Sequence, residues 1–144
     1  KQLERQAKGK AQATLSILDD VPRTLPAIQR AEKLQKRAAH VGFDWPQASQ
    51  VLDKIEEEIA ELRAAMEEND QAHIQDELGD LMFAMVNLAR HVNVKPEMAI
   101  RSTNEKFERR FKFLESRLVK QGVPLNEASL EQMESLWVAA KELE

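Results

Sequence analysis

Two pairs of acidic residues, placed symmetrically about a short polar break, constrain this chain more than any other feature. Glu58 and Glu61 are three residues apart, as are Glu77 and Asp80, so the members of each pair can share one side of a helix. The break between them, residues 67–71, reads EENDQ and has an apolar-periodic segment on either side. This pattern predicts two helices joined as an antiparallel hairpin.

The distances of the acidic residues from the turn place them at matching heights on the two helices. Glu61 and Glu77 are each eight residues from Asn69, and Glu58 and Asp80 are each eleven residues from it. At about 1.5 Å of rise per residue, both layers lie roughly 12 to 17 Å from the turn. The four carboxylates face one another for one of the two possible hands of the hairpin, and the sequence leaves that hand open.

Carboxylates that converge in this way repel one another unless a divalent cation lies between them. Because all the ligand atoms would be oxygens, the pattern indicates Mg²⁺, with Mn²⁺ as the alternative. The competing interpretation is a solvated acidic face, which is the usual role of a Glu-rich helix. The mirror spacing and the nearby apolar stripes favour the metal site.

The composition is that of an ordinary globular domain built from helices. The chain has 144 residues, of which 42% are hydrophobic and 32% charged, and strand-like alternation is hard to find in it. We therefore expect an all-α bundle of about four to five main helices with the acidic hairpin at its centre. Helices are expected over about residues 26–39, 46–68 and 71–92, from Pro96 towards a break at Gly122, and after a capping box at Ser129 and Gln132.

Several classes of protein are disfavoured by the same composition. The chain has no cysteine and no apolar run near the roughly 18 residues that span a bilayer. Its formal charge is −4. We expect a cytoplasmic protein that binds neither membranes nor nucleic acid polymers. Residues 1–18 are expected to be a linker or frayed helix and residues 19–144 the domain; a first residue of Lys is also what a fragment of a longer protein would show.

Four stretches together resemble a known family. The acidic residues read EEIAE at 57–61 and ELGD at 77–80, and the chain also carries DDVPR at 19–23, VGFDW at 41–45 and NEKFERRF at 104–111. In this order they resemble the C-terminal domain of MazG proteins, which are all-α nucleoside triphosphate pyrophosphohydrolases. The resemblance extends over about residues 18–137.

The resemblance implies Mg²⁺-dependent cleavage of a nucleoside triphosphate, ATP among them, between the α and β phosphates, giving the monophosphate and pyrophosphate. It also implies a homodimer or higher homo-oligomer. The implied metal ligands are Glu58, Glu61, Glu77 and Asp80, and the implied catalytic residues are Glu57, Glu58 and Glu61, with Glu57 a candidate for orienting or deprotonating water. The implied nucleotide contacts are Lys54, Glu57, Glu58, Asp76, Asp80, Lys106, Arg109, Arg110 and Trp137.

Alternatives remain for several of these residues. Lys106 and Arg110 share one side of a helix, where basic groups would suit a polyphosphate, but a solvated basic face is the commoner role. Trp137 is either a core residue or a ring that stacks on a base. Phe43 and Trp45 are interpreted as core residues, with a pocket lining as the alternative. For the whole chain, the alternative function is a non-catalytic helical oligomerisation or regulatory module.

Overall fold

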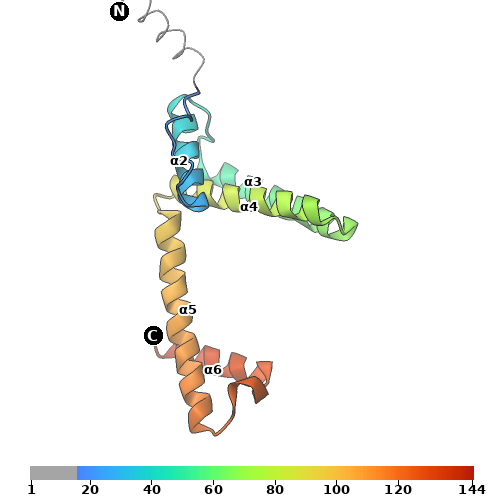
Figure 1. Cartoon of the computed structure of the whole chain (residues 1–144), viewed down its shortest axis with the longest axis vertical. Helices are drawn as coiled ribbons and strands as arrows, with labels where there is room; N and C mark the ends of the chain where they lie inside the picture. The colour runs from blue at the N-terminus through green and yellow to red at the C-terminus, as the bar shows by residue number, and fades with distance from the viewer. Residues whose placement is uncertain (1–15) are drawn as a thin grey trace, which may run out of the picture. The chain divides into compact units, whose positions relative to one another are not determined.

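The computed structural model describes residues 16–144, and these residues form helices and turns but no strand (Figure 1). The helices are α2 (Ala27–His40), α3 (Ala48–Glu68), α4 (Gln71–His91), α5 (Pro96–Lys120), the short 3₁₀ helix η1 (Leu125–Glu127) and α6 (Leu130–Glu142). The prediction of an all-α fold with four to five main helices is confirmed. Most of the predicted linker, residues 1–15, lies outside the described residues.

The chain divides into two compact units, Lys1–Glu97 and Met98–Glu144, and each unit is described by itself. The prediction of one domain over residues 19–144 stays a prediction. Within the described residues, no helix combines the length and the apolar character needed to cross a membrane.

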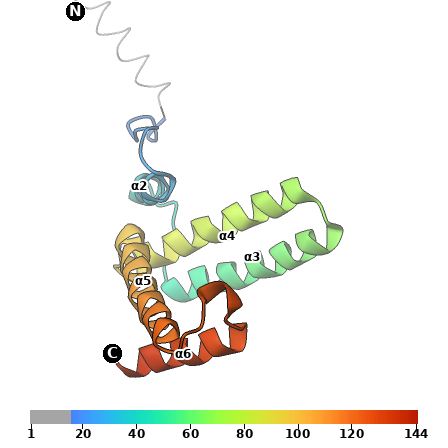
Figure 2. The same ribbon diagram turned by 60° about the horizontal axis from the view of Figure 1, so that its bottom comes forward.

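The centre of the first unit is the hairpin of α3 and α4, which run antiparallel and side by side (Figures 1 and 2). Asn69 adopts the left-handed conformation, with φ of 57°, and its N–H donates to the carbonyl of Met66, which ends α3. Asp70 then caps α4, because its side chain accepts hydrogen bonds from the backbone N–H groups of Ala72 and His73. The predicted hairpin is therefore confirmed, and its turn lies at Asn69 and Asp70.

The buried apolar side chains of the two hairpin helices are small or branched. Val51 and Ala65 of α3 are fully covered, and Ala84 and Val86 of α4 are buried. Short side chains let the helix axes approach closely, which brings the polar residues at the edges of the contact near one another. The position of the acidic residues follows from this packing.

Helix α2 and the loop after it pack on α4 in the same unit. The side chain of Gln35 donates a hydrogen bond of 2.9 Å to the backbone carbonyl of Phe83. Gly42 ends the region of α2 with φ of +89°, a conformation that glycine adopts without strain. Beyond it, Asp44 accepts hydrogen bonds from Arg90 at 2.6 Å and from His91 at 2.9 Å, and these hold the loop against the end of α4.

The second unit consists of most of α5, the η1 turn and α6, which turns back and crosses α5 (Figures 1 and 2). Leu114 and Leu118 of α5 and Ala140 of α6 are its buried residues. The predicted capping box is present: the Ser129 hydroxyl accepts from the backbone of Gln132, whose side chain accepts from the backbone of Ser129.

Two local predictions need correction. Helix α3 begins at Ala48 rather than at Pro46, because Gln47 is extended, with φ of −138°, and precedes the first helical turn. The interpretation of Phe43 and Trp45 as core residues is wrong, because Phe43 is 81% exposed and Trp45 is 43% exposed.

Candidate metal and nucleotide site

The acidic residues of the hairpin converge. One carboxylate oxygen from each of Glu58, Glu77 and Asp80 can be chosen so that all three lie within 4.8 Å of one another. Glu58 comes from α3 and is only 4% exposed. Glu77 and Asp80 come from α4; Glu77 is half-buried and Asp80 is exposed. The hairpin therefore has the hand that brings its carboxylates together, which the sequence had left open.

Each of the two more buried carboxylates has one oxygen held by a basic group. Lys54 contacts Oε1 of Glu58 at 3.0 Å, and His73 contacts Oε1 of Glu77 at 3.2 Å and Oε2 of Glu68 at 2.9 Å. Among the described residues, the other oxygen of both Glu58 and Glu77, Oε2, is buried without a hydrogen-bond partner. A buried acceptor left unpaired costs about 1 to 3 kcal/mol, and more when charged. An oxygen-binding cation is the kind of group that would remove this cost.

Glu61 lies beside this cluster but outside the group of three. The negative charge of Glu58 is the main cause that raises the pKa of Glu61, and burial and the nearby Glu77 raise it further. The pKa of Asp80 is also raised, first by burial and then by the charges of Asp76, Glu58 and Glu77. These shifts show that the carboxylates crowd one another, which is the electrostatic condition that favours a cation.

The remaining predicted residues of the hairpin lie at the edge of the cluster. Glu57 is exposed and contacts Lys54 at 3.4 Å, so Lys54 lies between Glu57 and Glu58. The hydrogen bond to Glu58 is the main cause that raises the pKa of Lys54. Asp76 is exposed and acts on the cluster through its charge on Asp80.

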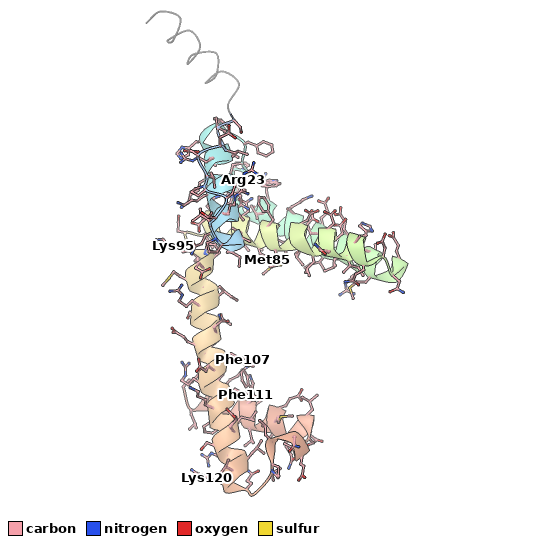
Figure 3. The ribbon with its side chains drawn as sticks, viewed as in Figure 1. Arg23, Met85, Lys95, Phe107, Phe111 and Lys120 are labelled. Carbon is pink, nitrogen blue, oxygen red and sulfur yellow. The ribbon has the colours of Figure 1, made fainter. Side chains whose placement is uncertain are left out.

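The second unit brings the predicted basic and aromatic residues together. The Arg110 guanidinium lies 5.7 Å from the centre of the Trp137 ring, and the Phe107 ring is 5.3 Å from the same ring. Phe111 is one turn further along α5 and is stacked with Phe107 at 6.0 Å (Figure 3). Trp137 is half-buried, so one ring has both apolar neighbours and a cation beside it.

The carboxylate of Glu144 is hydrogen-bonded to two adjacent arginines of this unit, Arg109 and Arg110. Arg110 donates two hydrogen bonds to Glu144, at 3.0 Å to Oε1 and 2.8 Å to Oε2, and Arg109 donates a third of 3.0 Å to Oε1. These hydrogen bonds lower the pKa of Glu144 to about 2, with that to Arg110 the largest cause. Lys106, one turn before Arg110, is exposed. The arginines thus bind an oxyanion in the planar, two-pronged manner that also suits phosphate.

Comparison with known proteins connects the acidic hairpin with a family. Residues 47–114, which include both hairpin helices, match the model of the MazG nucleotide pyrophosphohydrolase domain. This segment of the chain is therefore similar to that domain. The resemblance noted in the sequence is confirmed, and it now rests on the segment that carries the converging carboxylates.

Three relatives extend the match beyond the MazG domain. The chain is 49% identical over 131 residues, 90% of its length, to the nucleoside triphosphate pyrophosphohydrolase of Escherichia coli strain K12, and covers 50% of that protein. It is 39% identical over 139 residues, 96% of its length, to the nucleoside triphosphate pyrophosphohydrolase/pyrophosphatase MazG of Thermotoga maritima, covering 52% of it. It is 47% identical over 130 residues, 90% of its length, to the uncharacterized protein YabN of Bacillus subtilis, covering 27%. The chain thus spans about half the length of the first of these relatives.

Two contacts in the structure were not foreseen from the sequence. The link from His73 to Glu77 has a local signal, because the two residues are four apart on one helix. The contact between Arg110 and Glu144 has none, because 34 residues separate the partners and only the folded unit brings them together.

Proposed function

We propose that this protein hydrolyses nucleoside triphosphates between the α and β phosphates, releasing the monophosphate and pyrophosphate. The observation that carries the proposal is the convergence of Glu58, Glu77 and Asp80, with two buried oxygens unpaired, inside a MazG domain. Two relatives that carry the name nucleoside triphosphate pyrophosphohydrolase, over 90% or more of this chain, support the same reaction.

A divalent cation, Mg²⁺ before Mn²⁺, is the cofactor of this proposal. Its ligands would be Glu58, Glu61, Glu77 and Asp80, whose donor atoms are all the hard carboxylate oxygens that such ions prefer. When bound, the ion would neutralise phosphate oxygens and make a nearby water more acidic. Lys54 restrains one oxygen of Glu58 at 3.0 Å and leaves the other for the ligand role.

Proton transfer would fall to an exposed carboxylate at the edge of the cluster. Glu57 is exposed beside Lys54 and is the candidate for orienting or deprotonating water. Glu61 would act in catalysis as a ligand of the ion, whose charge would offset the repulsion that raises the pKa of Glu61 in the metal-free protein. A substrate contact by Asp76 is part of the same proposal.

The basic residues of α5 would bind the triphosphate. Arg110 already holds a carboxylate through two hydrogen bonds, and a phosphate oxygen pair presents the same planar acceptor geometry. Arg109 and Lys106 would add positive charge on the same helix. Trp137 would stack on the base, in a contact that every base can make.

The exposed apolar residues of the hairpin favour assembly with a second copy of the chain. On α3 the residues Leu52, Ile59 and Met66 repeat every seven positions, and all are at least 40% exposed. On α4 the corresponding face carries Leu78, Met82 and Met85, and the last is 54% exposed (Figure 3). An apolar stripe of this length on two adjacent helices is typical of a face that packs against further helices. We infer a homodimer or higher homo-oligomer, and sedimentation as a monomer at micromolar concentration would contradict it.

The reaction can be tested directly by its products. The protein is incubated with each nucleoside triphosphate and Mg²⁺, and the products are separated by ion-exchange chromatography. Monophosphate and pyrophosphate in equal amounts would support the proposal, whereas diphosphate and phosphate would contradict it. Absence of turnover with a stable oligomer would favour the alternative of a non-catalytic oligomerisation module.

A further inference from the structure

His73 lies in the first turn of α4 and contacts both helices of the hairpin. Its Nδ1 is 2.9 Å from Oε2 of Glu68, the last residue of α3, and its Nε2 is 3.2 Å from Oε1 of Glu77. Its backbone N–H donates to the side chain of Asp70 at 3.3 Å. The ring is therefore held at both nitrogens by carboxylates, and the backbone that carries it is held by the helix cap.

These contacts make His73 a neighbour of a metal ligand rather than a ligand itself. Both ring nitrogens face carboxylate oxygens, so neither is left to bind an ion. The converging ligand atoms of the cluster come from Glu58, Glu77 and Asp80. A proton on Nε2 donates to Glu77 whether or not Nδ1 is also protonated, so this contact does not depend on the charge of the ring. His73 can thus act on the cluster only through Glu77.

The same arrangement occurs on α3. Lys54 precedes Glu58 by four residues, as His73 precedes Glu77, and each basic group contacts Oε1 of its carboxylate. Residues four apart are neighbours on a helix, so each helix supplies a donor one turn before its own ligand. Oε2 of both Glu58 and Glu77 is buried without a hydrogen-bond partner among the described residues. A single pair of this kind is common on a helix surface, but the repetition at the two most buried carboxylates of the cluster favours a shared role.

A donor on one oxygen restricts where a carboxylate can place the other. The last torsion of a Glu side chain is broad and roughly twofold, so an unrestrained carboxylate offers either oxygen over a range of angles. A hydrogen bond to Oε1 of Glu77 narrows this range and leaves Oε2 as the atom available to an ion. Less order then has to be imposed when the ion binds, and residues that hydrogen-bond to metal ligands strengthen metal binding for this reason.

We propose that His73 is a positioning residue for the metal ion: it holds Oε1 of Glu77 and so keeps Oε2 in place for the ion. Glu68 has the complementary role of holding the ring from the other helix. The inference rests on the proposed function, in which Glu77 is a ligand of the ion.

Binding of Mn²⁺ in the absence of nucleotide tests the inference, so the result does not depend on turnover. Electron paramagnetic resonance measures free Mn²⁺ as the ion is added to the wild type and to His73→Ala. The Kd of His73→Ala should be about 10- to 100-fold higher. His73→Lys should recover most of the lost affinity, because it restores a donor four residues before the carboxylate, as Lys54 provides for Glu58. The matched control His40→Ala removes an exposed histidine outside the cluster and should bind Mn²⁺ as the wild type does.

Two other roles of His73 predict different results. A positive charge beside an anionic site repels an incoming ion, so if this repulsion were the main effect, His73→Ala would bind Mn²⁺ more tightly. If His73 only linked the two helices, His73→Ala would lower the Tm in EDTA and leave the Kd unchanged. Either result would overturn the inference, as would a loss of affinity that His73→Lys does not recover.

The outcome also separates this inference from the proposed function. No Mn²⁺ binding by the wild type would refute the metal site and the positioning role together. Binding by the wild type that His73→Ala leaves unchanged would refute the positioning role alone. If His73→Ala failed to fold, His73→Leu, which keeps more of the side-chain volume and also lacks a donor, would take its place in the same comparison.

Discussion

The metal site can be tested through stability, with the substitution Glu58→Gln. This change keeps the size of a side chain that is 4% exposed but removes one of the three charges that lie within 4.8 Å of one another. In the metal-free protein two effects oppose each other: the contact with Lys54 at 3.0 Å is weakened, and repulsion by Glu77 and Asp80 is relieved. We therefore expect the metal-free Tm to change by no more than about 3 °C.

The effect should appear when Mg²⁺ is added. At a free concentration 100 times its Kd, an ion that binds only the folded state stabilises it by about 2.7 kcal/mol. Removal of a residue that hydrogen-bonds to a metal ligand commonly weakens metal binding about 10- to 100-fold. Removal of a ligand itself should weaken metal binding by at least the same factor. A 100-fold loss leaves about 0.4 kcal/mol at the same concentration. For 144 residues, with about 3 °C per kcal/mol, the Mg²⁺-induced rise in Tm should fall from about 8 °C to about 1 °C.

Differential scanning calorimetry with and without Mg²⁺ measures both quantities. The matched control is Glu56→Gln, which makes the same change in net charge as Glu58→Gln. Glu56 is exposed on the same helix and lies outside the acidic cluster. The control should keep the full Mg²⁺-induced rise. If Glu58→Gln kept the wild-type rise, or if both variants lost it equally, a specific metal site at this cluster would be refuted.

Three further predictions concern single residues. The pKa of Asp80 is raised in the folded protein from its ordinary value of 3.8. Protonated Asp80 therefore stabilises the metal-free folded state when the pH is below 3.8, and this stabilisation is lost as the pH rises through the raised pKa. In EDTA, Asp80→Asn should therefore gain Tm relative to wild type between about pH 4 and 7, and a pH-independent difference would contradict this. Glu144→Gln should free Arg110 and tighten binding of a non-hydrolysable triphosphate in calorimetric titration, whereas the exposed Glu142→Gln should not. Asp70→Ala removes the helix cap and should lower the free energy of unfolding by about 1 kcal/mol and the Tm by about 3 °C. Asp70→Asn should retain most of the stabilisation that the cap provides.

The features that the sequence predicted well are those set by local interactions. Asn69 and the capping box of Ser129 each act through neighbours within a few residues, and each occurs where the pattern indicated. The matching heights of the acidic residues follow from a regular rise per residue, so they too could be calculated. The roles of these residues as ligands and in catalysis stay predictions.

Other features depend on contacts that no local pattern contains. The hand of the hairpin depends on which of two packings α3 and α4 adopt. The small buried residues Ala65 and Ala84 do not indicate which packing forms. The exposure of Phe43 and Trp45 depends on how the loop is held by Asp44, whose partners lie 46 and 47 residues away. Aromatic rings are usually buried, so a rule based on residue type alone placed them wrongly.

The exposed apolar stripe also links assembly to metal binding. Ile59 is 40% exposed and follows Glu58, and Leu78 is 44% exposed and follows Glu77, so each apolar residue lies about 100° around its helix from the carboxylate before it. A second copy that covers the stripe would exclude water from the side of Glu58 and Glu77 that faces the stripe. Exclusion of water strengthens both the repulsion among the carboxylates and their attraction for a cation. Binding of Mg²⁺ should therefore favour the assembled state, and assembly should raise affinity for Mg²⁺ by the same factor. Sedimentation velocity over a range of protein concentrations, with Mg²⁺ and with EDTA, measures this coupling. A dimer dissociation constant that is the same in both solutions would show that the ion and the partner act independently.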